Sequence, residues 1–341
     1  MLLEGLHLPL TTPFFADGRL NLKKLERNVE RYSLTPAAGL VALSESGEPG
    51  MLSDEETRLA LRAVAESAAA EKVLLAAVSR DSVAGTLDLA EYAGQSGYDA
   101  VLVGASAAAR NVRESLVYFQ SVADRSALPV VLLSGAEAPL PVEVVAELAG
   151  HPRVIGVVDF RTSLERVSIL KERTAAVKRE VVVTPVFAAA TGRMLGRRTE
   201  LVSAESLGEG SSGVVIAPAK AAVRTRTKVV GFQILAGGTE GMLEGLRGGA
   251  VGAVAAFAAC APQACYEVLA AWKDGDHGLA AEKQERLLEA ARRIEAELGV
   301  PGIKYGCDLN GYYGGLARLP LLPLTGAERG EVEDLMRGIR N

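Results

Sequence analysis

The feature of this sequence that most restricts its fold is a regular alternation of short apolar runs with amphipathic helical stretches. Such alternation is typical of repeated βα units, in which parallel strands form a sheet and helices cover it. Eight runs have the length and composition of buried strands, namely 7–13, 39–43, 73–78, 100–103, 129–133, 154–158, 229–235 and 250–255. Only 5% of the residues are aromatic while 49% are hydrophobic, which suits strands buried on both faces. Two medium domains would also fit 341 residues, but eight such units predict one (β/α)8 barrel, an α/β fold.

Two helix starts can be located from capping boxes, in which a hydroxyl and a carboxylate three residues apart satisfy free backbone N–H groups. Ser53 with Glu56, and Thr162 with Glu165, have this spacing, and each pair follows a predicted strand. Both pairs therefore support the order of strand followed by helix.

The chain continues beyond the eighth predicted strand. Three helical stretches at 262–272, 279–298 and 327–339 predict a C-terminal helical region. We therefore expect a barrel in residues 1–260 and a helical extension in residues 261–341 that packs on the barrel.

Residues 179–228 interrupt the rhythm between the sixth helix and the seventh strand. A connection at this place needs only a few residues, so the segment is an insert, either a subdomain or a partly disordered loop. It contains Gly208, Gly210 and Gly213 in the spacing of a dinucleotide-binding fingerprint. That fingerprint needs a strand before it and a helix after it. The flanking sequence favours neither, so we interpret the glycines as a turn, and a nucleotide-dependent oxidoreductase is the weakest functional hypothesis.

Charge and cysteine content limit the possible partners. The net charge is −5 with both signs interspersed, which offers no basic surface to nucleic acid or anionic lipid. The first residues lack the pattern of a signal peptide, and the uncharged stretch 248–266 is interrupted by Pro262 and Gln263, as in a buried strand and helix. The cysteines and histidines form neither a disulfide framework nor a metal-ligand pattern. These residues are Cys260, Cys265, Cys307, His7, His151 and His277. We therefore expect no metal, no cofactor and a cytoplasmic location.

Several ordered blocks carry a resemblance to a known family. Residues 39–56 read GLVALSESGEPGMLSDEE, which resembles the second strand and following loop of the dihydrodipicolinate synthase and N-acetylneuraminate lyase family. Further blocks match in order: PLTTPF at 9–14, YAGQSGYDAVLV at 92–103, HPRVIGVVD at 151–159, GIKYGCDLNGYYGG at 302–315 and RLPLLPL at 318–324. The resemblance covers nearly the whole chain except the insert, and it implies the same barrel fold.

The resemblance places a changed residue at the position that defines the family's chemistry. Its class I aldolases and lyases use a lysine on the sixth strand, which forms a Schiff base with pyruvate or a related 2-keto acid. An apolar pocket lowers the pKa of such a lysine, so that a neutral amine attacks the carbonyl. The family pattern is Gly-Ile-Lys-Asp, whereas this chain reads Gly156-Val157-Val158-Asp159. Val158 therefore occupies the lysine position, which implies a member without classical aldolase activity.

Other catalytic positions of the family are also changed. The tyrosine at the end of the fifth strand aligns with Leu133, and the tyrosine that joins the neighbouring subunit's site aligns with Ala107. The family's Pro-Gly-Arg after the fifth strand aligns with residues 136–138. The Thr-Thr pair that binds the keto-acid carboxylate is replaced by Glu45 and Ser46. Two carboxylates about 4 Å apart repel by on the order of 4 kcal/mol at an effective dielectric of about 20. Glu45 thus argues against pyruvate as the ligand, unless it is a solvated or structurally paired carboxylate.

A relocated catalytic lysine is not favoured by the order of the chain. Lys220 and Lys228 precede the seventh strand and belong to the N-terminal face, opposite the face where barrel enzymes carry out their chemistry. Lys304 matches a lysine common in the family's C-terminal helical region, and we interpret it as a helix-surface residue.

We expect a polar ligand pocket at the carboxyl ends of the strands. Its candidate residues are Thr11, Thr12, Ser44, Glu45, Ser46, Asp159, Arg161 and Gly238. Glu45 and Asp159 would serve as acid and base if their surroundings separate their pKa values. Alternatively, Asp159 holds a loop and pairs with Arg161.

Two functional hypotheses rank ahead of the oxidoreductase. The first is a family member that has lost catalysis and serves as a binding, regulatory or assembly protein. The second is a lyase or hydratase that acts without a Schiff base on a sugar-acid or keto-acid-like ligand. Because family barrels usually assemble as dimers or tetramers, we expect a homo-oligomer with a small-molecule ligand, and neither nucleic acid nor a membrane as partner.

Overall fold

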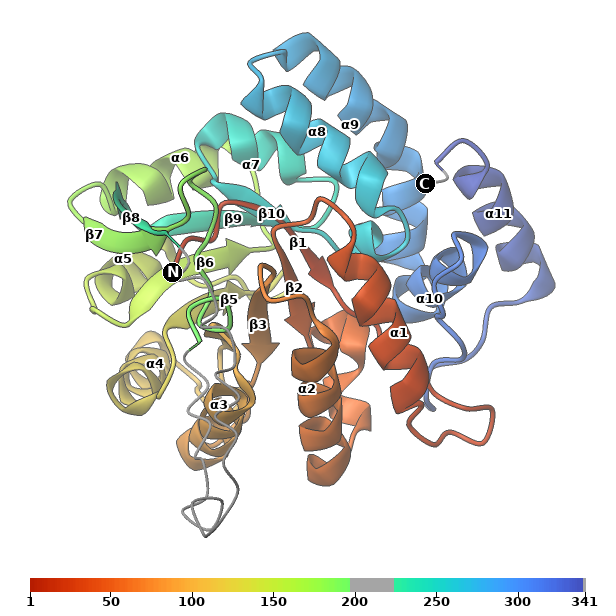
Figure 1. The fold of residues 1–341 in the computed structure, drawn as a ribbon, viewed down its shortest axis with the longest axis horizontal. Coiled ribbons are helices and arrows are strands. Elements are labelled where there is room, and N and C mark those ends of the chain that lie inside the picture. The colour runs from red at the N-terminus through yellow and green to blue at the C-terminus, as the bar shows by residue number, and fades with distance from the viewer. Residues whose placement is uncertain (197–223, 340–341) are drawn as a thin grey trace, which may run out of the picture.

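A closed barrel of eight parallel strands forms the centre of the molecule (Figure 1). The computed structural model describes residues 1–196 and 224–339. The barrel strands are β1 (Gly5–Pro9), β2 (Gly39–Ala42), β3 (Val73–Ala77), β4 (Ala100–Gly104), β5 (Val130–Ser134), β6 (Val154–Asp159), β9 (Gln233–Gly237) and β10 (Gly252–Val254). Their spatial order is β1-β10-β9-β6-β5-β4-β3-β2, with β1 and β2 also paired. The predicted (β/α)8 fold is confirmed.

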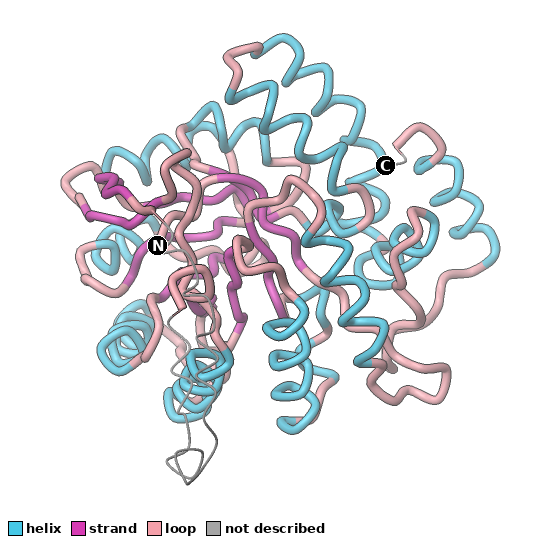
Figure 2. The backbone as a smooth tube through the Cα atoms, in the orientation of Figure 1, coloured by secondary structure: helices cyan, strands magenta, loops and turns pink. Residues whose placement is uncertain are grey.

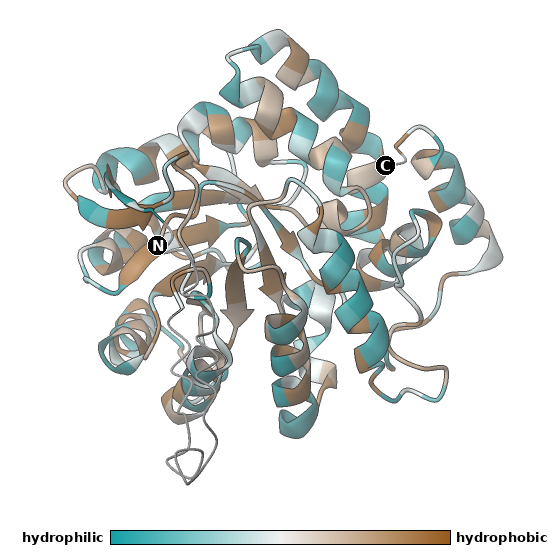
Figure 3. Cartoon of the chain, viewed as in Figure 1, coloured by the Kyte–Doolittle hydropathy of each residue, from teal (hydrophilic) through white to brown (hydrophobic). Residues whose placement is uncertain are grey.

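Helices follow the strands and surround the barrel (Figure 2). They are α1 (Leu22–Ser33), α2 (Asp54–Ser67), α3 (Val83–Ser96), α4 (Val112–Arg125), α5 (Val142–Ala149), α6 (Leu164–Arg173) and α7 (Met242–Gly248). Colouring by hydropathy shows apolar strands at the centre and helices with a polar outer side (Figure 3). This pattern is expected, because a parallel strand is buried on both faces whereas a covering helix is buried on one.

Two apolar cores result from the alternation of side chains along the strands. The larger core lies between the barrel and its helices and includes Val157 and Ile234. The smaller core includes Val158 and Leu235, the neighbours of those residues in sequence, together with Val131. Because successive side chains point to opposite faces of a strand, the smaller cluster fills the interior of the barrel.

The described part of the predicted insert forms a separate two-stranded sheet. β7 (Arg179–Val183) pairs antiparallel with β8 (Arg226–Val230). The predicted strand 229–235 is therefore corrected, because its first two residues belong to β8 and the barrel strand begins at Gln233. Residues 231 and 232 connect the two strands, and the sequence pattern did not show this break. Gly208, Gly210, Gly213 and Lys220 lie outside the described residues.

The C-terminal region contains one more helix than the sequence predicted. It consists of α8 (Pro262–Lys273), α9 (His277–Ala291), a π-helical turn (Arg292–Glu297), α10 (Gly299–Leu309) and α11 (Gly326–Met336). The predicted helix 279–298 is thus α9 together with the π-helical turn. Helix α10 was missed because its first residues include Gly299, Pro301 and Gly302, which are poor helix formers.

One of the two predicted capping boxes is confirmed and the other is wrong. The Ser53 hydroxyl accepts a hydrogen bond from the Glu56 N–H, and the Glu56 carboxylate accepts one from the Ser53 N–H. Helix α6 instead begins after Ser163, whose hydroxyl accepts from the N–H of Arg166. Thr162 is not available as a cap because its hydroxyl donates to the carbonyl of Asp159.

Closure of the barrel depends on a close approach between β1 and β10, and this generates a test. A Cβ at Gly252 would lie 2.1 Å from the carbonyl oxygen of Gly5 and 2.7 Å from its nitrogen. We expect Gly252→Ala to lower the free energy of unfolding by about 3 kcal/mol, because the two strands must separate to accept the methyl group. Urea unfolding followed by circular dichroism measures this change.

Gly330→Ala is the matched control for this substitution. Gly330 lies in α11, where an added methyl group would meet none of the described atoms within 4 Å. Alanine there should leave stability unchanged or raise it by about 1 kcal/mol. Equal stability of the two variants would contradict the prediction that closure of the barrel requires the close approach of β1 and β10.

Candidate functional site

The side chain of Val158 points into the barrel. It is fully buried and belongs to the interior cluster with Leu235 and Val254, against which Leu133 packs. Leu133 and Val158 are direct neighbours in the pairing of β5 with β6. The two positions at which the resemblance implies a tyrosine and a lysine therefore form one apolar surface inside the barrel.

Asp159 points to the opposite side of the same strand, away from the interior. Its side chain is fully buried, and one carboxylate oxygen lies 2.5 Å from Nε of Arg166 on α6. The other oxygen accepts a hydrogen bond from the main-chain N–H of Arg161. The predicted ion pair with Arg161 is thus wrong, because the Arg161 side chain is exposed and Arg166 is the partner. Arg166 also donates to the carbonyl of Leu140, so it joins β6 to the loop after β5.

Hydroxyl groups line the loops that follow β1 and β2. The Thr12 hydroxyl donates to the carbonyl of Gly47 at 2.6 Å and joins these loops. The hydroxyls of Thr11 and Ser44 are buried and have no hydrogen-bond partner among the described residues. Thr11 and Thr12 border a cavity of about 10 Å³, close to the space that one water needs. Buried unpaired hydroxyls are costly, so each of these two gains from a hydrogen bond with water or with another polar group.

The remaining predicted pocket residues differ in exposure. Glu45 is exposed at the start of a short 3₁₀ turn (Glu45–Gly47), in which Ser46 is buried. Ala107 is exposed in the loop after β4, where its N–H donates to the carboxylate of Asp81. Gly238, directly after β9, has φ +78°, a conformation that favours glycine.

A buried ion pair joins α10 to the loop after β2, and sequence reasoning missed it. Lys304 on α10 is fully buried, and its Nζ lies 2.5 Å from Glu48 Oε1. Nζ also donates to the carbonyl of Leu316 and lies 4.5 Å from the centre of the Phe14 ring. Burial lowers the pKa of Lys304, and the Glu48 carboxylate opposes that shift. The prediction of a helix-surface lysine is therefore wrong. Its small and apolar neighbours Ile303 and Cys307 were the available signal of a buried helix face.

Arg318 extends this network to the loops at the carboxyl ends of the strands. Its guanidinium forms a two-pronged ion pair with Glu56, at 2.7 and 2.8 Å, and donates to the carbonyl of Gly18. Its main-chain N–H donates to Glu48, and its guanidinium carbon lies 4.2 Å from the centre of the Phe14 ring. The Phe14 ring thus contacts two cations. The C-terminal region thereby fixes the loops after β1 and β2 in position.

A further carboxylate, that of the half-buried Glu295, lies at the carboxyl ends of β9 and β10. Glu295, in the π-helical turn, accepts hydrogen bonds from the N–H and the hydroxyl of Thr239 and from the N–H of Phe257. Burial raises the pKa of Glu295, and these hydrogen bonds oppose the shift. No pattern in the sequence indicates this contact, because Glu295 lies among charged helix residues that resemble a solvated face.

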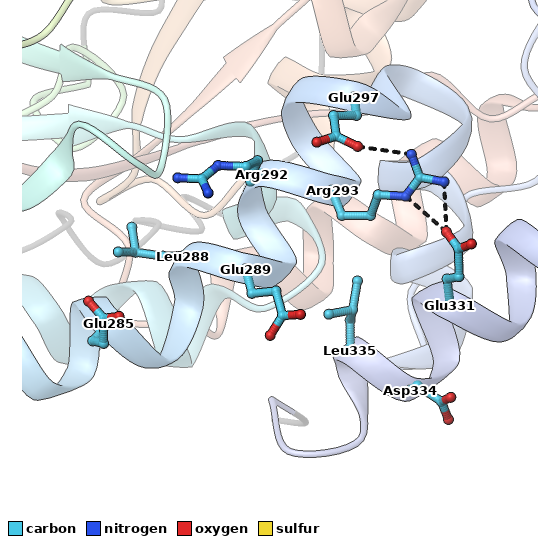
Figure 4. A pocket seen from close by; sticks show the side chains of 9 residues that line it. All are labelled: Glu285, Leu288, Glu289, Arg292, Arg293, Glu297, Glu331, Asp334 and Leu335. Carbon is cyan, nitrogen blue, oxygen red and sulfur yellow. Dashed lines mark hydrogen bonds and ion pairs between the residues drawn. The ribbon is translucent and has the colours of Figure 1, made fainter.

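A cleft of about 710 Å³ lies between α9, the π-helical turn and α11 (Figure 4). Arg293 at this cleft pairs with Glu297 and Glu331. The lining residues are Glu285, Leu288, Glu289, Arg292, Arg293, Glu297, Glu331, Asp334 and Leu335. The cleft is mainly charged and does not include a predicted pocket residue.

Two further properties concern the described residues 1–196 and 224–339 alone. Within them, no three side chains of histidine, cysteine, aspartate or glutamate are grouped as a metal ion requires. None of the helices in these ranges combines the length and apolar character needed to span a bilayer.

Fold and site together define a (β/α)8 barrel whose mouth is held by a C-terminal helical region. The sequence matches the Dihydrodipicolinate synthetase family over residues 2–182 and 216–339, and the chain belongs to this family. Residues 183–215, within the insert, lie outside the match.

Curated relatives and solved structures agree with this family and fold. The chain is 26% identical over 340 residues to a 4-hydroxy-tetrahydrodipicolinate synthase of Acidiphilium cryptum, covering 98% of each chain. It is 35% identical over 174 residues to the enzyme of the same name from Xanthomonas axonopodis pv. citri, covering 50% of this chain and 58% of that one. The crystal structure of a dihydrodipicolinate synthase from Bacillus anthracis has a TM-score of 0.79 at 19% identity, covering 99% of both chains.

The buried ion pair predicts a large effect of removing one partner. We expect Lys304→Met to lower the free energy of unfolding by about 3 to 5 kcal/mol, because it leaves Glu48 buried without a counter-charge. Lys304→Met combined with Glu48→Gln should recover part of this loss in urea unfolding. Lys273→Met is the control, since Lys273 pairs with Glu4 at the surface and should change stability by less than about 1 kcal/mol. A loss in Lys304→Met that is no larger than the control contradicts a stabilising buried pair.

The ion pair of Glu56 with Arg318 predicts a dependence of stability on pH. The hydrogen bond from Arg318 lowers the pKa of Glu56 from 4.5 to about 2. A lowered pKa in the folded state stabilises the protein above pH 4.5, and this contribution is lost as the pH falls toward 2. The stability advantage of the wild type over Glu56→Gln should therefore shrink across this range in urea unfolding. Glu55→Gln, at an exposed position of the same helix, is the control. If the stability advantage of the wild type over Glu56→Gln stays constant with pH, Arg318 does not lower the pKa of Glu56.

Proposed function

We propose that this chain is a member of the family that binds a small hydroxylated or keto acid in the barrel mouth without capturing it as an imine. The observation that supports the proposal most directly is the valine at position 158, whose side chain faces the barrel interior. Imine formation needs an amine with a free electron pair close to the carbonyl carbon. An isopropyl group has no such pair, and Leu133 beside it has no proton to transfer.

Lys304 is the alternative amine that the proposal must exclude. It lies near the loops after β1 and β2, but it is fully buried and contacts Glu48 and the carbonyl of Leu316. Glu48, the carbonyl of Leu316 and the Phe14 ring surround this amine, so the carbonyl carbon of a ligand does not reach it. Lys304 is therefore expected to hold Glu48 in place and not to attack a ligand.

The relatives set the class of ligand for the proposal. Their name, 4-hydroxy-tetrahydrodipicolinate synthase, describes those proteins. One solved family structure, from E. coli K12, is a complex with pyruvate, at 21% identity to this chain. From these relatives we extend to this chain only the class of ligand, a small acid, and not the covalent step. Assembly into a dimer or tetramer in the cytoplasm belongs to the same proposal, although another solved structure is that of a monomeric dihydrodipicolinate synthase variant.

A lyase or hydratase without a Schiff base is the second candidate. The unpartnered hydroxyls of Thr11 and Ser44, within the described residues, favour a hydroxylated ligand beside the exposed Glu45. Asp159 does not support an acid and base pair with Glu45, because its carboxylate is fully buried against Arg166. Any acid or base in this second candidate is therefore Glu45.

Reductive trapping tests the proposal. Incubation with pyruvate and borohydride should leave the mass of the intact protein unchanged, since no lysine occupies position 158. A catalytically active family member treated in parallel should gain the mass of the reduced adduct. An adduct on this chain, located by peptide mapping, overturns the proposal, and an adduct on Lys304 would identify the amine responsible.

Restoring the missing groups separates two causes of inactivity. Val158→Lys with Leu133→Tyr supplies an amine and a proton carrier, and Glu45→Gln removes the charge expected to repel the ligand's carboxylate. We expect trapping in the triple variant only. Trapping in the double variant would show that Glu45 does not repel the ligand.

A further inference from the structure

The surroundings of Glu295 resemble an anion-binding site that is already filled. Its carboxylate accepts the N–H of Thr239, after β9, at 3.3 Å, and the N–H of Phe257, after β10, at 3.0 Å. The Thr239 hydroxyl adds a bond of 2.5 Å. Main-chain N–H groups of two loops and one hydroxyl therefore converge on a single carboxylate.

These donors follow the last two strands of the barrel. β9 and β10 are the seventh and eighth barrel strands in chain order. In many (β/α)8 enzymes the loops after these two strands bind the phosphate of the ligand through main-chain N–H groups. In this chain the donors at that place hold a carboxylate that the protein itself supplies.

The local backbone determines where this carboxylate lies. Glu295 lies in the π-helical turn Arg292–Glu297, whose wider winding changes the direction in which the side chain leaves the helix. Gly238, directly before Thr239, has φ +78°, a backbone conformation that favours glycine. Thr239 and Phe257 are fully buried, so solvent does not satisfy their donors.

We propose that the Glu295 carboxylate is an internal substitute for a ligand anion, which closes the phosphate-type site of the barrel mouth. The wild-type barrel thus selects ligands that bring no phosphate to the ends of β9 and β10. Removal of the carboxylate frees the donors and creates a site for inorganic phosphate. This inference concerns ligand selection and stands whether or not an imine forms at another position.

The test compares Glu295→Ala with two matched variants in thermal unfolding, with sodium phosphate against sodium chloride at equal ionic strength. We expect the unfolding midpoint of Glu295→Ala to rise saturably with phosphate, by about 2 °C at ten times its Kd. Glu295→Gln should not respond, because the amide oxygen still fills the site. Glu297→Ala changes the net charge equally on the same turn, where Glu297 pairs with Arg293, and should not respond either.

The outcomes distinguish a filled anion site from a structural hydrogen-bond cluster. The proposal is overturned if Glu295→Ala gains no more stability in phosphate than Glu297→Ala, or if the wild type gains as much as Glu295→Ala. Should Glu295→Ala not fold in chloride, refolding in phosphate is the same test. Recovery in phosphate alone supports the proposal, and failure in both salts overturns it.

Discussion

The buried ion pair between Lys304 and Glu48 is the contact on which the arrangement of the barrel mouth depends. It joins α10 to the loop after β2, and the Arg318 contacts with Glu56 and Gly18 extend the connection to the loop after β1. Charges buried in this way are costly to separate, because each one alone loses its hydration without compensation. The C-terminal region is therefore a structural part of the mouth and not an independent appendage. The hydroxyl-bearing loops keep their positions because charged groups on a distant part of the chain hold them.

Two adjacent side chains on β6 point to opposite faces of the strand and therefore have different surroundings. Val158 faces the barrel interior, where a reactive group would meet a ligand, whereas Asp159 faces α6 and is neutralised by Arg166. A strand side chain cannot change face without a shift of register. The polar character of Asp159 therefore does not compensate for the aliphatic character of Val158. This geometry favours a structural role for the carboxylate, which fixes α6 and the loop after β5 relative to the sheet.

Much of the fold could be predicted because its signals are local and repeated. Apolar runs at regular spacing indicated the strands, and the insert was evident from the length of one connection. The errors arose where local patterns do not report tertiary contacts. Lys304 was assigned to the surface from its charge, yet its partner Glu48 is distant in sequence. Thr162 had the spacing of a cap, but its hydroxyl is bonded to the carbonyl of Asp159. Glu295 reaches Thr239 through a π-helical turn, which no simple helical periodicity describes.

The sides of the mouth differ in what they offer to a ligand. Near β5 and β6 the surface is apolar, as Leu133 and Val158 require. At β9 and β10 the main-chain donors are occupied by Glu295. Among the described residues, three buried hydroxyls have no partner: those of Thr11 and Ser44 lie after β1 and β2, and that of Thr57 lies in α2. Because an unpaired buried hydroxyl gains more from a new hydrogen bond than a satisfied donor does, polar groups of a ligand are stabilised most at β1 and β2. In the binding mode that we propose, the apolar part of the ligand lies toward Val158, so the residue that would prevent imine formation would also set the orientation of the ligand.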